Sequence, residues 1–154
     1  MTHNAPLASL LAPFRAAQHQ HEHLHGLSTR LDGMCNCLSA DPPLPLPPEL
    51  EPATLIGEWS VQLSGHFAAE EGLRYFGTLA TERPALVTTL ADLRADHAEM
   101  LEAIEHLTLI AADPARRREL LTGTRELMAR LRTHETVENA MLEEFFRDSS
   151  PAET

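Results

Sequence analysis

The chain has 154 residues, enough for one domain with a single core, and 43% of them are apolar while only 5% are aromatic. The abundance of Leu, Ala and Glu favours helices over a β-sandwich or barrel. A formal net charge of −11 excludes a general nucleic-acid-binding surface, which needs clustered Lys and Arg, and it disfavours binding to an anionic membrane.

Other features narrow the expected location of the protein. No stretch reaches the ~20 apolar residues of a membrane span, and the N-terminus lacks the basic and apolar regions of a signal peptide. Cys35 and Cys37 are the two cysteines, and at this spacing on a helix they point to different faces, so we expect no disulfide between them. We expect a cytoplasmic protein with reduced thiols, in which Cys35 is an inert buried residue.

Prolines divide the sequence into four long segments of helical composition. The stretch 41–52 holds six of the 11 prolines and predicts a loop, and further breaks precede Pro84 and Pro114. Helices are predicted over residues 7–38, 53–80, 84–112 and 114–147. We expect Asp113 to cap the last helix and Pro13 to delay or kink the first. Short connections favour antiparallel neighbours, so the predicted fold is an all-α, antiparallel, up-down-up-down four-helix bundle in one domain.

Each predicted helix carries an apolar stripe that alternates steps of three and four residues and would face the centre of the bundle. Each stripe is interrupted near its middle by a histidine, and the four are His21, His66, His97 and His134. Two stripes are interrupted again one turn later, by Glu70 and Glu138. At a rise of about 1.5 Å per residue, the distances from the helix ends place all four histidines near one level of the core.

These interruptions indicate a metal site. A single histidine on an apolar face is usually a satisfied core residue, but a buried ionised glutamate is costly unless a charge compensates it, and the stripes contain no Lys or Arg near Glu70 or Glu138. Each glutamate follows its histidine by four residues, so both side chains share a helix face and one metal can take both, or the glutamate can bridge two. Six imidazole and carboxylate ligands exceed the four of a tetrahedral zinc and suit two ions of iron, manganese or zinc.

An ordered set of short motifs spans the chain from about Leu7 to Phe146. The motifs are His21, His66-Phe67-Ala68-Ala69-Glu70-Glu71, Asp96-His97, His134-Glu135-Thr136-Val137-Glu138 and Leu142-Glu143-Glu144-Phe145-Phe146. This set resembles the hemerythrin-like domains, also called HHE cation-binding domains. The resemblance implies a non-haem di-iron centre with an oxo, hydroxo or water bridge. It implies the ligands His21, His66, Glu70, His97, His134 and Glu138, with the two glutamates bridging.

The third predicted helix departs from the family's oxygen carriers. The carriers place two histidines four residues apart there, whereas Leu93 and Leu101 stand at that spacing from His97. One terminal imidazole is therefore missing unless His25 or a water replaces it, which argues against reversible oxygen carriage in the manner of the carriers. Relatives with fewer histidines are associated with nitric oxide or oxygen response, iron sensing and repair of damaged iron–sulfur clusters.

Three functions remain open from the sequence. The first is a metal-binding module that binds or senses oxygen, nitric oxide or iron, with a small diatomic molecule as its ligand. The second is a di-iron enzyme or iron donor in oxygen or peroxide chemistry or in iron–sulfur cluster repair. The third is an interaction protein whose metal is structural. The sequence does not decide whether the chain is an enzyme.

Several neighbours of the expected ligands are ambiguous. His23 is the main rival of His21, because residues two apart on a helix face apart, and His25 can join His21 as an i,i+4 pair. His106 lies off its stripe and is expected at the surface. Glu71 and Glu135 are expected to face outward, with a supporting position behind a ligand as the alternative. Asp96 is expected to be solvated unless it orients a neighbour, and Tyr75 is expected to pack in the core unless its hydroxyl donates to a ligand.

Overall fold

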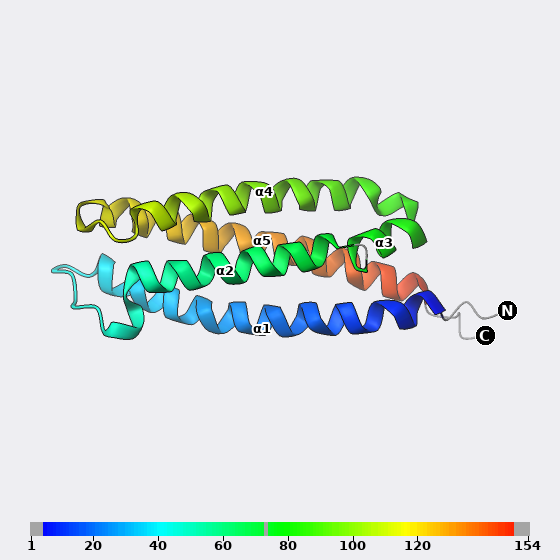
Figure 1. Ribbon diagram of the computed structural model, residues 1–154, viewed down its shortest axis with the longest axis horizontal. Coiled ribbons are helices and arrows are strands. Elements are labelled where there is room, and N and C mark those ends of the chain that lie inside the picture. The colour runs from blue at the N-terminus through cyan, green and yellow to red at the C-terminus, as the bar shows by residue number, and fades with distance from the viewer. Residues whose placement is uncertain (1–4, 73, 150–154) are drawn as a thin grey trace.

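Five α-helices form most of the computed structural model, which describes residues 5–72 and 74–149, with the backbone alone for residues 5–9 and 149 (Figure 1). The helices are α1 (Ala5–Ser39), α2 (Pro52–Glu71), α3 (Phe76–Glu82), α4 (Val87–Ile110) and α5 (Arg117–Ser149). Single turns of 3₁₀ helix at Pro48–Leu50, Pro84–Leu86 and Pro114–Arg116 precede α2, α4 and α5. No strand occurs in these described ranges, and the predicted all-α class is confirmed.

The four long helices run antiparallel in an up-down-up-down bundle (Figure 1). α1 packs against α2 and α5, and α4 packs against the same two helices. The proline-rich connection after α1 (cyan) lies at one end of the bundle, and α3 (green) lies at the other (Figure 1). None of the described helices combines the length and the apolar character needed to cross a membrane. The predicted four-helix bundle is confirmed.

The predicted second helix, 53–80, is wrong because two helices occupy that span. The backbone at Gly72 is extended, with φ −62° and ψ 156°, and α2 ends there. A helix ends at glycine at low cost because only proline has a weaker helix propensity. The chain turns, with the Tyr75 N–H donating to the Gly72 carbonyl at 3.1 Å, and α3 begins at Phe76. Leu73, expected to continue the apolar stripe, lies outside the described residues.

The helix starts follow their capping residues. Asp113 is confirmed as an N-cap, because its carboxylate accepts from the Ala115 N–H at 3.0 Å. The Glu51 carboxylate accepts from two free N–H groups in the first turn of α2 in the same way. Pro13 does not delay α1, which begins at Ala5 and continues through the proline. The residue at which each capped helix starts determines how far along the bundle each later side chain lies.

A polar layer divides the core of the bundle into two apolar clusters. One cluster includes Trp59, Leu63 and Met100, and the other includes Phe76 and Leu93. The buried polar residues that separate them include His66, Glu70, His97, His134 and Glu138. In α4, for example, Met100, three residues after His97, belongs to the first cluster, and Leu93, four residues before it, belongs to the second. The apolar packing is therefore interrupted at the level that the sequence predicts.

The two cysteines give a test of the packing of α1. Both are free thiols, with Cys35 buried and Cys37 half-buried. Burial raises the pKa of the Cys35 thiol, which lowers its thiolate population near neutral pH. We expect iodoacetamide to alkylate Cys37 at least ~10-fold faster than Cys35 in the folded protein, with the difference lost in denaturant. Mass spectrometry of time points measures both rates, and equal rates in the folded protein would contradict the burial of Cys35.

Candidate metal centre

Six side chains from the four long helices meet in the polar layer. They are His21 of α1, His66 and Glu70 of α2, His97 of α4, and His134 and Glu138 of α5. Five of them are buried, and the side chain of His21 is 21% exposed. The i,i+4 spacing in α2 and α5 directs each His–Glu pair to the bundle axis, while α1 and α4 add one histidine each. The structure thus brings together all six residues that the sequence singles out.

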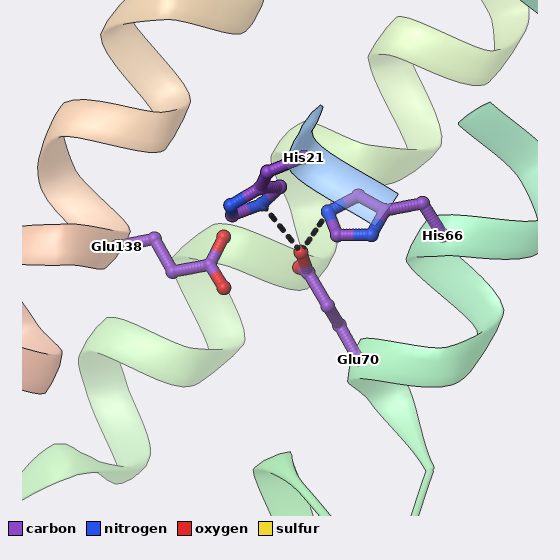
Figure 2. A group of neighbouring side chains, drawn as sticks. All are labelled: His21, His66, Glu70 and Glu138. Carbon is purple, nitrogen blue, oxygen red and sulfur yellow. Dashed lines mark ion pairs between the residues drawn. The ribbon is translucent and has the colours of Figure 1, made fainter. Parts of the chain in front are cut away.

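Figure 2 shows the first of two donor groups in this layer. His21, His66, Glu70 and Glu138 each offer one atom, and these atoms all lie within 4.8 Å of one another. Glu70 Oε1 lies 3.6 Å from His21 Nε2 and is in closer contact with His66 Nε2. Glu138 points into the same space from the opposite side (Figure 2). Two imidazoles and two carboxylates around one point have the chemistry of a site for iron, manganese or zinc.

The second donor group, Glu70, His97 and His134, shares its carboxylate with the first. Glu70 Oε2 lies 3.1 Å from His97 Nε2, and the Nε2 atoms of His97 and His134 are 3.0 Å apart. Glu138 Oε2 lies 3.8 Å from His134 Nε2. Glu70 therefore lies between two sets of imidazoles, with one oxygen turned to each set.

Oxygen atoms behind three of the rings determine which imidazole nitrogen faces the donor groups. The contacts are His66 Nδ1 with Gln20 Oε1 at 2.8 Å, His97 Nδ1 with Glu71 Oε1 at 3.2 Å, and His134 Nδ1 with Asp96 Oδ2 at 2.8 Å. Because these oxygens accept hydrogen bonds, each Nδ1 carries the ring proton and the Nε2 lone pair faces inward. A histidine backed in this way has the orientation of a metal ligand.

Electron-rich atoms face one another inside the two groups. Neither carboxylate oxygen of Glu70 has a hydrogen-bond partner among the described residues, and the same holds there for His21 Nε2 and Glu138 Oε2. Buried acceptors that face other acceptors are unfavourable unless a proton or a cation lies between them. Cations at the two groups would satisfy the carboxylates and the imidazole lone pairs together, so the residues present fit a pair of metal ions.

The two carboxylates differ in their electrostatic environments. Burial alone would raise the pKa of Glu70, but its contacts with three imidazoles hold the pKa well below the usual range. Burial, followed by the negative charge of Glu70, raises the pKa of Glu138 to about 9. Burial also lowers the pKa of His134, which favours the neutral ring that a metal requires. Without a compensating cation, Glu138 therefore keeps its proton near neutral pH, and a bound cation would displace that proton.

Two polar residues contact candidate ligands of the site, as in the alternatives that the sequence left open. The prediction that Asp96 is solvated is wrong, because its carboxylate is half-buried between His134 Nδ1 and the guanidinium of Arg130, whose Nε donates at 2.7 Å. Tyr75 packs in the second apolar cluster as expected, and it also donates to a candidate ligand, as in the alternative. Its hydroxyl donates to Glu138 Oε1 at 3.0 Å. The break between α2 and α3 places this tyrosine against α5, so a continuous helix would not give the same contact.

Residues that surround the candidate ligands without belonging to a donor group are harder to predict from the sequence. Glu71 does not simply face outward, because its side chain is 39% exposed and still reaches His97 Nδ1. Gln20 is a contact that the sequence analysis missed, and its one signal is its position beside His21. Glu135 is half-buried, and burial raises the pKa of its carboxyl group. Such contacts depend on how far each helix is displaced sideways, which an apolar stripe does not specify.

The histidines of residues 19–25 and His106 differ in the direction they face. One of them faces the core of the bundle, and the others lie at the surface. Of the four histidines in residues 19–25, His21 is the one in a donor group, and both His23 and His25 are exposed. His106 is exposed and contacts Glu119 Oε1 at 2.8 Å, so its predicted surface position is confirmed. The histidine-rich turn of α1 thus presents one imidazole to the core and the others to solvent.

Aromatic rings cover one side of the second donor group. The Phe67 ring stacks on the His97 ring with centroids 4.0 Å apart and an interplanar angle of 9°. The Phe76 ring lies near parallel to the same imidazole at 5.8 Å. These contacts hold the plane of the imidazole and exclude water from that side.

The arrangement matches a known family. The model of the hemerythrin HHE cation-binding domain matches residues 12–146, a span that includes all six residues of the two donor groups. The chain belongs to this family. Hemerythrin HHE domains bind metal cations, and the histidine and glutamate groups of this HHE chain fit that property. Curated proteins and solved structures gave no match.

In this HHE domain, Asp96 offers a test of the oxygen behind His134. Asp96→Asn keeps the shape of the side chain but loses the charge that favours a proton on Nδ1, so we expect metal binding to weaken ~10- to 100-fold. Competition with a chromophoric chelator measures the affinity. Glu99→Gln is the matched control, because Glu99 contacts Arg130 but not the histidine. Unchanged affinity in Asp96→Asn would contradict an orienting role for this carboxylate.

Proposed function

We propose that this HHE domain holds two iron ions in its polar layer and that a small diatomic molecule, dioxygen or nitric oxide, binds to them. The proposed ligands are His21, His66, Glu70, His97, His134 and Glu138. The observation that carries the proposal is the sharing of Glu70 between two donor groups, since a carboxylate between two sets of imidazoles suits two ions better than one. Bound iron supplies one-electron redox changes and a position for an added ligand. Manganese and zinc are the alternative metals.

The chain's own residues would orient the ligands and limit access to them. Oxygen acceptors behind three rings keep the Nε2 lone pairs turned inward, and Glu70 and Glu138 supply the negative charge. Each donor group contains four or fewer side chains, which leaves coordination positions open at an octahedral ion. Leu93, which is buried, is one of the two residues at the spacing from His97 at which the oxygen carriers have a second histidine. This apolar neighbour would shape the space in which a diatomic ligand binds.

A second candidate function is a di-iron enzyme or an iron donor in oxygen or peroxide chemistry or in iron–sulfur cluster repair. The lack of a second histidine four residues from His97 in α4 favours it, because fewer protein ligands leave an ion more open to substrates and easier to release. Leu101, on the other side of His97, is half-buried and cannot ligate. A spectral change that reverses when dioxygen or nitric oxide is removed supports binding, whereas consumption of a substrate together with a reductant supports catalysis.

The first experiment measures the metal content per chain by elemental analysis of protein purified without a histidine tag. A visible absorption spectrum is recorded on the same sample. We expect about two irons per chain, one for each donor group. His66→Ala and Glu138→Ala should lose metal and the visible bands, while His106→Ala, at an exposed position on α4, should keep both. Wild-type protein without stoichiometric metal after growth in iron-rich medium would overturn the proposal.

A further inference from the structure

A groove on the surface of the bundle leads to the first donor group. It lies between residues 12–17 of α1 and the junction of α2 with α3, and its volume is about 660 Å³. Its walls include the small side chains of Ala12, Ala16 and Ala69, and its lining includes Glu70 and Tyr75. Arg74 and Tyr75 lie in the turn between α2 and α3 and line the groove, so the space borders the helix break and is not filled by a continuing helix.

The floor of this groove is Glu70, whose exposed fraction is 1%. Both of its carboxylate oxygens lack a hydrogen-bond partner among the described residues. A second cavity, of about 350 Å³, borders His21 and is separated from the groove by residues common to both linings, Ala17 and Tyr75. The groove therefore reaches the shared carboxylate directly, while the second cavity reaches the histidine of α1.

The rim of the groove carries a positive charge without a partner. Arg74 lines the groove, is exposed, and makes no ion pair or hydrogen bond with any residue in the described part of the chain. Some other guanidinium groups at the bundle surface are engaged, for example Arg30 with Glu58 and Arg130 with Asp96. A guanidinium binds a carboxylate through two parallel hydrogen bonds, so the rim can take an anionic group.

Size, wall chemistry and charge define the class of ligand. A volume of several hundred Å³ is typical of sites for small organic molecules, whereas a molecule of the size of water occupies only about 30 Å³. Alanine walls favour an apolar body, and the free guanidinium at the rim favours a carboxylate at one end.

We propose that the groove binds a small organic carboxylate, with its carboxylate on Arg74 and its apolar end directed toward Glu70. The proposal deepens the proposed function, since the apolar end would face the metal pair. The groove itself and its free arginine do not depend on the metal.

The test uses hexanoate as the probe and hexan-1-ol as its uncharged counterpart. In the full-length protein labelled at alanine methyl groups, we expect hexanoate to shift the NMR signals of Ala12, Ala16 and Ala69. Arg74→Gln should weaken hexanoate binding about ten-fold, the loss of a charge-assisted pair, and should leave hexan-1-ol binding unchanged. Arg132→Gln, which replaces an exposed arginine of α5, is the matched control and should bind hexanoate as the wild type does.

Two further measurements locate the ligand. Ala16→Phe fills the groove at an exposed position and should abolish binding of both probes, and a far-ultraviolet circular dichroism spectrum checks that it folds. In protein loaded with Mn²⁺, relaxation of the terminal methyl group of hexanoate should be enhanced more than that of the methylene next to its carboxylate. The reverse order would place the carboxylate on the metal and overturn the proposed orientation.

The outcomes separate this proposal from the proposed function. If the protein binds no metal, the proposed function fails and the relaxation measurement gives no enhancement. The alanine methyl shifts and the variants still decide whether the groove binds hexanoate. If metal binds but hexanoate shifts other methyl groups, or Arg74→Gln binds it as the wild type does, the groove proposal is overturned alone. Equal affinity for hexanoate and hexan-1-ol would overturn the assignment to carboxylates.

Discussion

Glu70→Gln is expected to lower the metal content from about two ions per chain to nearly none. The reason is that Glu70 belongs to both donor groups, with Oε1 turned to the imidazoles of the first and Oε2 toward His97. Glutamine keeps the size of the side chain but removes the negative charge, and a neutral amide is a much weaker ligand for a divalent cation. Elemental analysis of the purified variant and a titration with Fe²⁺ under anaerobic conditions measure the effect.

Two comparisons show whether the loss is specific to a shared carboxylate. His21→Ala removes one donor from the first group only, so this variant should retain at least one ion. Glu102→Gln changes an exposed carboxylate of α4 and should retain both. If Glu70→Gln kept as much metal as Glu102→Gln, or lost no more than His21→Ala, Glu70 would not be shared between two ions.

Removal of the metal by a chelator is expected to lower the melting temperature by about 8–16 °C. A ligand at a thousand times its dissociation constant stabilises a folded protein by about 4 kcal/mol, and each kcal/mol corresponds to about 2–4 °C for a chain of this size. The stability is lost in the polar layer. Without cations, the acceptor atoms of Glu70, Glu138 and the imidazoles face one another there. Thermal unfolding with and without chelator measures it, and an unchanged melting temperature would mean that the metal does not bind in the core.

The chelated protein should also become less stable as pH rises from 7 to about 9. The pKa of Glu138 is raised to about 9 by burial and by the charge of Glu70, while in the unfolded chain it is near 4.3. The folded state therefore binds more protons than the unfolded state in this range, and the free energy of unfolding falls as pH rises. The pKa of His21 is also raised, by Glu70 against the opposing effect of burial, and its contribution has the same sign.

Glu138→Gln isolates the contribution of the carboxylate to this pH dependence. Glutamine does not titrate, so the chelated variant should show a smaller fall in stability between pH 7 and 9 than the chelated wild type. Urea unfolding at several pH values provides the free energies. A wild type whose stability rises over this range would show that Glu138 is already ionised in the folded protein.

The bundle and the level of the polar layer were predictable because they depend on regular geometry. An α-helix repeats every 3.6 residues and rises by 1.5 Å per residue, so the apolar stripe gives the buried face and the proline breaks give the heights. His66 and His97 fall at one level for this reason, and the stripe of α1 selects His21 over its exposed neighbours. An ionised glutamate on such a stripe is conspicuous, since it is stable there only with compensation.

The outer contacts of the site and the break in α2 were decided by the tertiary structure. Asp96 precedes His97 in sequence but contacts His134 on another helix, because its direction depends on how α4 and α5 are turned and displaced against each other. The apolar pattern continues past Gly72, and the helix ends there because glycine costs little to take out of a helix and the turn allows Tyr75 to reach Glu138. The sequence by itself determined the helices, their buried faces and the depth of the histidines, since these follow from the period of one helix. Lateral contacts between helices are set by packing around the whole core, and only the tertiary structure decided them.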